Sequence, residues 1–416
     1  MKKIAIVGSG LVGCLTAFKI AKKFPKSQVY LIDGSNNILQ SFKSIRMDNL
    51  KLNNGFHALD IDRCKELYNF FKDTLKVKFK KTKTARHLLI NEKLIKENQK
   101  IKEYPTSLRK EFLKKKIISN NINILYSGLS EKLQQLIKKV SQRYSNSLKD
   151  NLQHFIPWFL PKEYHLKSLD EGDIYRNKIR TQNKQTLLAV PHSGLFETIS
   201  SQFKKKLKKK KNIQILLNTK IFFENNNIIF KKNDQILSLD FDYIFICTGS
   251  MVMIDKKGKN FKDILTNSKL FVGCAVSSNY PANINFSEII CLNKNFIELS
   301  RVSKIAKKKT KHFFLIEFLF KNNDNLNKKI NKIKLQKILK PIFSDSAKSL
   351  KIVDYKVTRK VFFPKNTKIK NGTKEVKKLI NKISTKKNKI FCNINFGPMN
   401  MAKTWIVSEN NLKMIR

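Results

Sequence analysis

The chain has 416 residues, of which 41% are hydrophobic, so it can bury a large core and is not a wholly disordered protein. Its length favours about two to three domains, and its formal net charge is +54. Apolar runs stay shorter than the ~18 residues of a membrane-spanning helix, and the first residues lack the pattern of a signal peptide.

The positive charge comes almost entirely from lysine. Only ten of the 85 basic residues are arginine, which proteins prefer for gripping bases and phosphates. Lysine is spread along the chain with asparagine and isoleucine, and all three have A- and T-rich codons, so a biased genome accounts for the composition. We therefore predict a solvated lysine surface and no specific nucleic-acid partner. The densest run, Lys204–Lys211, ends a predicted helix, and a weak attraction to anionic membrane surfaces stays open.

The first elements follow a strand, glycine loop, helix and strand pattern. Residues 3–7 are a short apolar strand, residues 14–24 have helical periodicity, and residues 28–32 form a second strand that stops at Asp33. The loop between strand and helix reads Gly8-Ser9-Gly10-Leu11-Val12-Gly13. This order and spacing predict a dinucleotide-binding unit.

Each part of this unit has a chemical reason. Gly8 permits the tight turn, Gly10 lets the backbone approach a pyrophosphate, and Gly13 lets the helix pack on the sheet. The helix N-terminus offers free N–H groups to the anion, and we expect Ser9, Leu11 and Val12 to line the same loop. Asp33 can accept hydrogen bonds from a ribose and would repel a 2′-phosphate, which disfavours NADP.

Four later segments carry further motifs. Residues 55–57 read Gly-Phe-His, residues 189–221 contain Pro-His-Ser-Gly before a helix and a strand, and residues 240–249 form a strand ending in Thr248-Gly249. Residues 395–402 read Asn-Phe-Gly-Pro-Met-Asn-Met-Ala. In this order the segments resemble the motifs of the superfamily that contains amine oxidases, protoporphyrinogen oxidases and UDP-galactopyranose mutases. The double glycine that this superfamily usually has after the acid is missing from residues 34–46.

The resemblance implies FAD as the cofactor, held non-covalently because no cysteine or histidine is positioned for a covalent bond. It also implies that the strand after the helix of residues 189–221 ends near the adenine. Besides the first loop, the implied cofactor-binding residues are Gly55, Thr248, Gly249, Gly397, Met399 and Asn400.

The expected fold class is α/β. A Rossmann-type, glutathione-reductase-like FAD domain would carry an inserted substrate domain of antiparallel sheet plus helices. The FAD domain is expected to be discontinuous, and the rest of the chain is divided by its periodicity. The expected boundaries are 1–63 with 187–262 and 385–416 for the FAD domain, 64–186 for a helical insertion, and 263–384 for the antiparallel-sheet domain.

Three residues are candidates for chemistry beside a flavin. His57 lies in the segment that the superfamily places close to the flavin, where it could orient the ring or move a proton. Arg301 and Arg359 fall in the expected substrate sheet, where a guanidinium fork could bind a carboxylate or phosphate. The alternative for these arginines is an internal salt bridge, for example to Glu317. No metal-ligand spacing is found among the cysteines and histidines.

The resemblance implies a flavin-dependent oxidoreductase of the amine-oxidase-like group that transfers a hydride from a small-molecule substrate to flavin N5. The alternative is an isomerase like UDP-galactopyranose mutase, acting on a nucleotide sugar in surface polysaccharide synthesis. A lysine-rich nucleic-acid-binding protein with a vestigial nucleotide domain is the third hypothesis. The six scattered cysteines fit a reducing compartment, so we expect a cytoplasmic protein.

Overall fold

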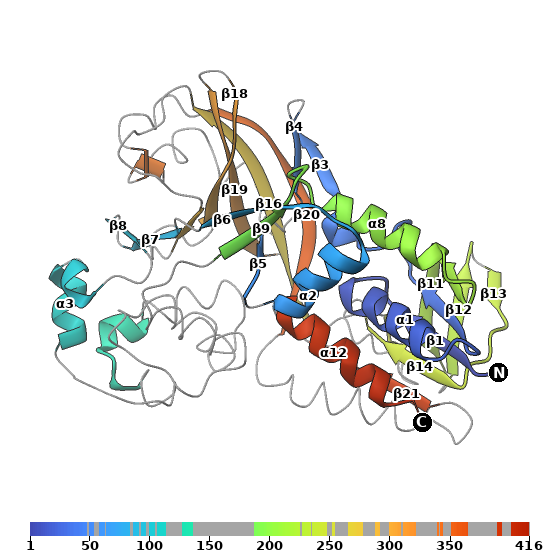
Figure 1. Ribbon diagram of the computed structural model, residues 1–416. Helices are drawn as coiled ribbons and strands as arrows, with labels where there is room; N and C mark the ends of the chain where they lie inside the picture. The colour runs from blue at the N-terminus through green and yellow to red at the C-terminus, as the bar shows by residue number, and fades with distance from the viewer. Residues whose placement is uncertain are drawn as a thin grey trace.

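The computed structural model places two kinds of sheet in the chain. Figure 1 shows a parallel sheet with its helices beside the two termini and a larger, mainly antiparallel sheet next to it. The residues that the structure describes are 1–47, 50–53, 58–62, 64–83, 86–90, 93–96, 100–104, 106–113, 127–135, 187–224, 227–233, 235–247, 252–253, 265–277, 288–291, 299–308, 311–321, 339–340, 342–343, 351–364, 389–392 and 401–415.

The parallel sheet has five strands in the order β10-β2-β1-β14-β21. All four strand pairings are parallel, and the strands come from the start, the middle and the end of the chain. The order reverses at β1, so the carboxyl ends of β1 and its neighbours form the place where α/β sheets bind ligands. The strands are β1 (Lys3–Val7), β2 (Gln28–Ile32), β10 (Ile213–Leu216), β14 (Tyr243–Ile246) and β21 (Lys389–Cys392).

The two faces of this sheet bury alternate residues of each strand, as period-two side-chain geometry requires. Ile4 and Ile6 pack in the cluster formed with the helices, whereas Ala5 and Val7 pack against a second sheet. The helices are α1 (Leu11–Lys23), α2 (Lys65–Asn69), α8 (Glu197–Lys208) and α12 (Met401–Lys413). The second sheet has the order β13-β12-β11-β15, from β11 (Thr219–Glu224), β12 (Asn227–Lys232), β13 (Gln235–Leu237) and β15 (Val252–Met253).

The large sheet has seven strands in the order β20-β16-β19-β18-β17-β7-β8. All its pairings are antiparallel except that of β17 with β7. The chain over residues 265–364 therefore does contain antiparallel strands, as predicted for residues 263–384. They are β16 (Leu265–Ser277), β17 (Glu288–Cys291), β18 (Leu299–Lys308), β19 (Lys311–Lys321) and β20 (Lys351–Pro364), joined by β7 (Arg86–Ile90) and β8 (Lys93–Lys96).

The expectation of helices throughout residues 64–186 is wrong for the strands between residues 79 and 96. Helix α2 continues through a π-helical turn, η2 (Phe70–Thr74), and α3 covers Thr106–Leu113, but β7 and β8 form a hairpin of the large sheet. Leu89 and Ile95 of this hairpin are buried. Packing of these side chains in the large sheet therefore stabilises strands here instead of a helix. The strand β6 (Phe79–Lys83) pairs with β9 (Leu187–Pro191), which also pairs with β5 (Leu59–Asp60).

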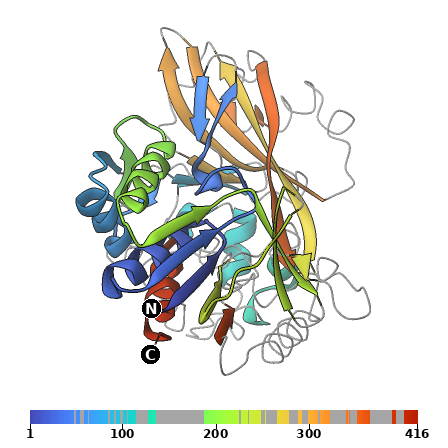
Figure 2. The ribbon, with the colours of Figure 1, turned by 90° about the vertical axis from the view of Figure 1, so that its right-hand side faces the viewer.

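Short elements connect the two regions. The hairpin of β3 (Ser44–Met47) and β4 (Leu50–Asn53) follows the short helix η1 (Gln40–Phe42), and β3 contacts β20 of the large sheet. A short 3-10 helix, η3 (Ile101–Glu103), precedes α3. Figure 2 shows the hairpin rising from the nucleotide region towards the long strands. Among the described residues, the helices are all too short or too polar to span a bilayer.

A buried lysine fastens the last helix to the first. Lys19 of α1 is only 9% exposed, and its ammonium donates to the Ser408 hydroxyl at 2.7 Å and pairs with Glu409 at 2.5 Å. The same ammonium lies 3.4 Å from the centre of the Trp405 ring. Burial lowers the pKa of Lys19, and Glu409 opposes this effect. The side chain therefore stabilises the α1–α12 contact, mainly through the buried hydrogen bond to Ser408, since Glu409 is 39% exposed and its ion pair is partly screened.

Replacing Lys19 with alanine is expected to lower the free energy of unfolding by about 2 kcal/mol, because Ser408 and Glu409 lose a buried, charged partner. Urea denaturation measures this change. Lys22→Ala is the matched control, since Lys22 lies on the same helix but is exposed, and it is expected to cost less than about 0.5 kcal/mol. Equal losses for the two variants would contradict a stabilising role for the Lys19 contacts.

Candidate nucleotide-binding site

The glycine loop lies at the carboxyl end of β1 and is shaped by two of its glycines. Gly8 has φ 103°, a conformation that L side chains rarely adopt, and its N–H donates to the Ile32 carbonyl at 2.7 Å. A Cβ on Gly13 would lie 1.7 Å from the Gly8 carbonyl oxygen, so helix α1 passes directly against the loop. Both positions therefore require glycine for the fold itself.

Gly10 is different because the protein leaves space in front of it. A Cβ built on Gly10 meets no described atom within 4 Å, and its φ of −65° suits any residue. Gly10 is also the N-cap of α1, and Cys14 N–H makes the first helical bond, to the Gly10 carbonyl at 2.9 Å. Since no neighbouring protein atom requires glycine at position 10, we expect the reason to be a ligand that approaches the backbone closely there.

The start of α1 suits an anion. No side chain of the described chain caps the helix, and its first turn contains no acidic residue. The N–H groups of Leu11, Val12 and Gly13 precede the first helical hydrogen bond, so helix geometry gives them no acceptor within α1. Their partial positive charge and the helix dipole favour a phosphate at this point.

Asp33 stands beside the loop at the carboxyl end of β2. Its carboxylate accepts the Ser9 N–H at 2.5 Å on one oxygen and the Ser35 N–H at 2.7 Å on the other. Each carboxylate oxygen can accept a further hydrogen bond. Asp33 therefore holds the two backbone segments together and keeps acceptor capacity for ribose hydroxyls.

The turn after β10 lies directly next to Asp33. The Asp33 N–H donates to the Leu216 carbonyl at 2.9 Å, and the Thr219 N–H donates to the Asp33 carbonyl at 2.9 Å. Asn218, at φ 55°, donates its N–H to the Ser35 carbonyl at 3.0 Å. The strand end expected near the adenine is therefore brought beside the ribose candidate. The sequence analysis did not single out Asn218, although asparagine tolerance of positive φ marks such turns.

A buried thiol on α1 donates a hydrogen bond to the glycine loop. The Cys14 Sγ donates to the Ser9 carbonyl at 3.2 Å. Complete burial raises the pKa of this thiol well above its usual range, and the charge of Asp33 and the nearby Cys247 raise it further. Cys14 therefore stays a neutral hydrogen-bond donor. Asn411 of α12 donates to Thr16 at 3.0 Å and lies 3.7 Å from the Cys247 Sγ, which ties the last helix to this region.

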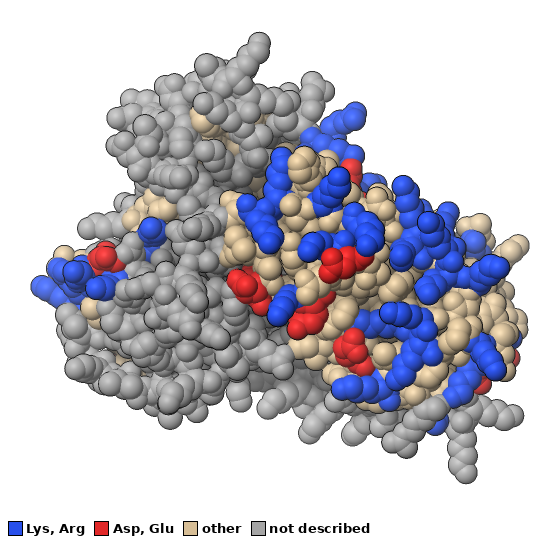
Figure 3. Space-filling view, viewed as in Figure 1, with Lys and Arg blue, Asp and Glu red and all other residues tan. Residues whose placement is uncertain are grey.

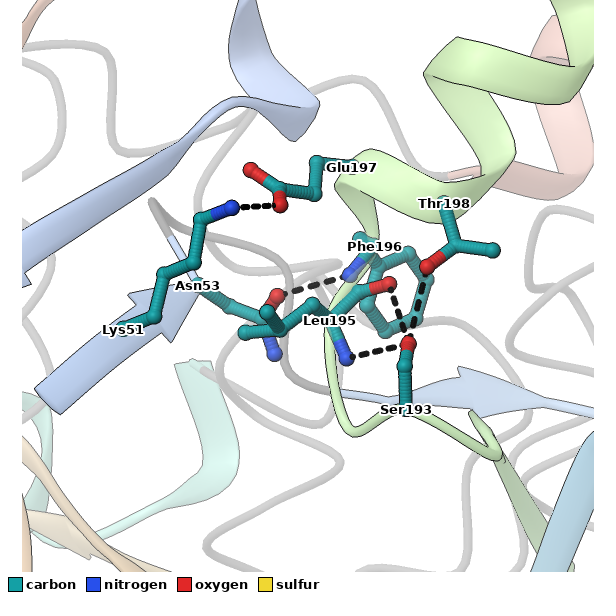
Figure 4. A network of polar contacts seen from close by, with 7 residues as sticks. All are labelled: Lys51, Asn53, Ser193, Leu195, Phe196, Glu197 and Thr198. Carbon is teal, nitrogen blue, oxygen red and sulfur yellow. Dashed lines mark hydrogen bonds and ion pairs between the residues drawn. The ribbon is translucent and has the colours of Figure 1, made fainter.

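A polar network joins the β3–β4 hairpin to the start of α8 (Figure 4). Asn53 donates to the Gly194 carbonyl and accepts the Phe196 N–H, both at 2.8 Å. It thereby caps α8 from a distant strand, since the N-cap residue Phe196 has no polar side chain. Ser193 accepts the Leu195 N–H at 3.2 Å, and Lys51 pairs with Glu197. The network fixes the hairpin just before residues 54–57.

The Lys51–Glu197 pair gives this network a pH dependence. Burial raises the pKa of Glu197. The hydrogen bonds from Lys51 and Ser44 and the charge of Lys51 lower it by a larger amount, so the net shift is downward. A carboxyl group with a lowered pKa stabilises the fold above its ordinary pKa of about 4.3, and this stability is lost as pH falls through the lowered pKa. Since Lys51 is half exposed, the effect is expected to stay below about 1 kcal/mol.

Glu197→Gln is expected to remove this acid-sensitive contribution. The difference in unfolding free energy between wild type and variant should be largest at neutral pH and shrink towards pH ~3. Denaturant unfolding at several pH values measures it, with Glu66→Gln at an exposed position of α2 as the control. A wild-type advantage that grew on acidification would show the sign to be wrong.

The structure brings some of the predicted site residues together and not others. Gly8, Ser9, Gly10, Leu11, Val12, Gly13 and Asp33 converge at one edge of the sheet. The predicted residues Gly55, His57, Thr248, Gly249, Gly397, Met399 and Asn400 lie outside the described residues. The strands β14 and β21, which precede five of them, run parallel to β1 and so end at the edge where the glycine loop lies.

The two predicted arginines are separated. Arg301 lies on β18 and Arg359 on β20, with β19 and β16 between these strands. Three strand spacings correspond to about 14 Å across the sheet between the two strands. In the register of β18 with β19, Arg301 stands opposite Glu317, which is the position that the salt-bridge alternative requires.

Comparisons with known proteins give no match by sequence and a consistent match by structure. No protein-family profile matches the chain, and no curated protein is detectably similar in sequence. Reduced UDP-galactopyranose mutase aligns over 100% of this chain and 95% of its own, with 12% identity and a TM-score of 0.64. A putrescine oxidase variant aligns over 99% and 98%, with 10% identity and a TM-score of 0.60.

A protoporphyrinogen oxidase-like protein from Exiguobacterium aligns over 100% of this chain and 98% of its own, with 12% identity and a TM-score of 0.57. All three alignments run over nearly the full length of both chains, so they include the large antiparallel sheet as well as the nucleotide region. At these identities the matches establish the fold. The chain therefore has the fold of the superfamily of amine oxidases, protoporphyrinogen oxidases and UDP-galactopyranose mutases.

Proposed function

We propose that the chain binds FAD non-covalently and is an FAD-dependent oxidoreductase of the amine-oxidase-like group. The observation that carries this proposal is the geometry of the glycine loop. Gly10 faces open space beside an uncapped helix start, while Asp33 stands next to it with free acceptor capacity. Gly8 and Gly13 are needed for the fold, whereas the space in front of Gly10 supports a ligand that approaches the backbone there.

The chain's own residues would share the work of holding the cofactor. The N–H groups of Leu11, Val12 and Gly13 would bind the pyrophosphate, and Asp33 would accept the ribose hydroxyls. Bound FAD supplies the redox chemistry, because its flavin accepts a hydride at N5. The segments with Gly55, Thr248, Gly249, Gly397, Met399 and Asn400 are proposed to complete the cofactor site. Non-covalent attachment remains part of the proposal.

The substrate side of the proposal rests on three residues. His57, which follows the hairpin fixed by Asn53, would orient the flavin or hold a proton. Arg301 and Arg359 would bind an anionic group of a small-molecule substrate, each at its own place in the large sheet. The scattered positions of the six cysteines in the sequence support our proposal of a reducing, cytoplasmic environment.

Anaerobic mixing with candidate amines tests the oxidoreductase proposal. A true substrate is expected to bleach the flavin absorption near ~450 nm without any added reductant. Re-exposure to oxygen or a quinone should restore the band. A panel of amines and other small reductants that never bleaches the band, with FAD bound, would argue against this function.

The second candidate is an isomerase like UDP-galactopyranose mutase. It is supported by the alignment with the reduced mutase, whose TM-score of 0.64 is higher than the 0.60 of the putrescine oxidase variant. An isomerase is expected to bind UDP and to convert a nucleotide sugar only after reduction by dithionite, with no net consumption of reductant. Turnover by the oxidised protein alone would exclude this candidate.

A further inference from the structure

The structure gathers lysines from two distant parts of the sequence at one edge of the parallel sheet. Asn212 directly follows the lysine run of α8, and its side-chain amide donates to the carbonyls of Ala21, Phe24 and Ser27 at 3.2, 3.4 and 3.1 Å. These carbonyls belong to the end of α1 and the turn after it. The C-terminal ends of α1 and α8 are therefore held side by side.

We call this surface the lysine edge and define it by its six exposed lysines. They are Lys22, Lys23, Lys26, Lys208, Lys209 and Lys211. Over the part of the chain that the structure describes, none of the six forms an ion pair with a carboxylate. Figure 3 shows basic side chains predominating where α8 ends, whereas the acidic side chains of this view lie mainly nearer the middle of the molecule.

The lysine edge lies opposite the glycine loop. It lies beside the amino ends of β2 and β10, because Lys26 and Lys211 come two residues before these strands begin. The loop lies at the carboxyl ends, about five strand residues or ~16 Å away. A partner bound at the lysine edge would leave the proposed cofactor site uncovered.

We propose that the lysine edge docks the protein on an anionic lipid surface. Lysine ammonium groups are mobile point charges, which suit a fluid layer of headgroups and need no fixed geometry. Nucleic-acid sites favour arginine and exposed aromatic rings, whereas none of the cations of this edge is arginine, Phe18 and Phe203 are buried, and Phe24 is half-buried beside Lys23. The proposal goes beyond the proposed enzyme activity and does not depend on it.

Flotation of the full-length protein with lipid vesicles at ~150 mM salt tests the proposal. One set of vesicles is pure phosphatidylcholine, and the other contains about 30% phosphatidylglycerol. The edge variant carries Lys→Gln at the six defining positions. The control variant carries Lys→Gln at six exposed lysines on other elements, namely Lys43, Lys65, Lys78, Lys80, Lys110 and Lys220. Both variants lose the same net charge, and thermal unfolding checks that both are folded.

Wild type is expected to float only with the anionic vesicles. The edge variant should lose that affinity by ~10-fold or more, since several lysines act at one contact, while the control should lose less than about threefold. Equal losses in both variants would show that net charge alone is responsible and would overturn the proposal. Failure to bind anionic vesicles, or an edge variant that loses single-stranded RNA binding instead, would overturn it as well.

Discussion

Gly13→Ala is expected to abolish cofactor binding and to destabilise the fold. The new methyl group would start 1.7 Å from the Gly8 carbonyl oxygen, so the loop and helix α1 must move apart. Overpacking of this kind costs about 1–3 kcal/mol, and the upper end applies because the clash is with backbone. The free energy of unfolding of the cofactor-free protein should fall accordingly, and no FAD should co-purify.

Gly10→Ala separates a ligand effect from a folding effect at the same loop. Its methyl group meets no described protein atom within 4 Å, so the cofactor-free protein should keep its stability to within about 1 kcal/mol. The methyl would intrude on the pyrophosphate, and a cost of about 1–3 kcal/mol corresponds to a roughly 10- to 100-fold weaker FAD complex.

Urea denaturation and FAD titration of the two glycine variants together provide the test. Gly13→Ala should lower both the free energy of unfolding and the affinity for FAD, whereas Gly10→Ala should lower only the affinity for FAD. If Gly10→Ala bound FAD as tightly as wild type, the loop would not be the pyrophosphate site. If Gly13→Ala kept normal stability, the close approach of α1 to the loop would be wrong.

Asp33→Ala is expected to weaken FAD binding by roughly 10- to 100-fold, because hydrogen bonds to a charged acceptor are worth about 1.5–3 kcal/mol. The variant also leaves the Ser9 and Ser35 N–H groups without their carboxylate acceptor. Part of the loss should therefore appear as lower stability, by about 1–2 kcal/mol. Fluorescence titration with FAD and urea denaturation measure the two components.

Asp242→Ala is the matched control for this carboxylate. Asp242 also accepts a backbone N–H, that of Lys3 at 2.7 Å, but it precedes β14 at the amino edge of the same sheet. Its loss of stability should be smaller, because its single hydrogen bond is exposed, and its FAD affinity should stay unchanged. Equal FAD losses in the two variants would mean that the Asp33 effect is indirect.

The elements predicted most closely are those whose sequence pattern is local. The spacing alone predicts the strand, glycine loop and helix around Gly8–Gly13, because the turn and the helix contact that require these glycines lie within a few residues of them. The antiparallel strands expected within residues 263–384 likewise follow from local periodicity. Short-range periodicity is enough for such elements.

Pairings between distant residues could not be predicted in this way. The hairpin of β7 and β8 is stabilised by β17, which lies about 200 residues later in the chain. Asn53 caps a helix 143 residues away, and Lys19 binds a hydroxyl 389 residues away. A lone asparagine or lysine has no local pattern that reveals its partner, so these contacts emerge only from the three-dimensional structure.

The central claim is that the loop of residues 8–13 holds FAD, and the visible absorption spectrum of the purified protein tests it most directly. We predict bands near ~375 and ~450 nm, released into the supernatant by heat because the flavin is not covalently attached. The released compound should be FAD. A protein that stays colourless after incubation with FAD would contradict the claim and with it both proposed flavin-dependent activities.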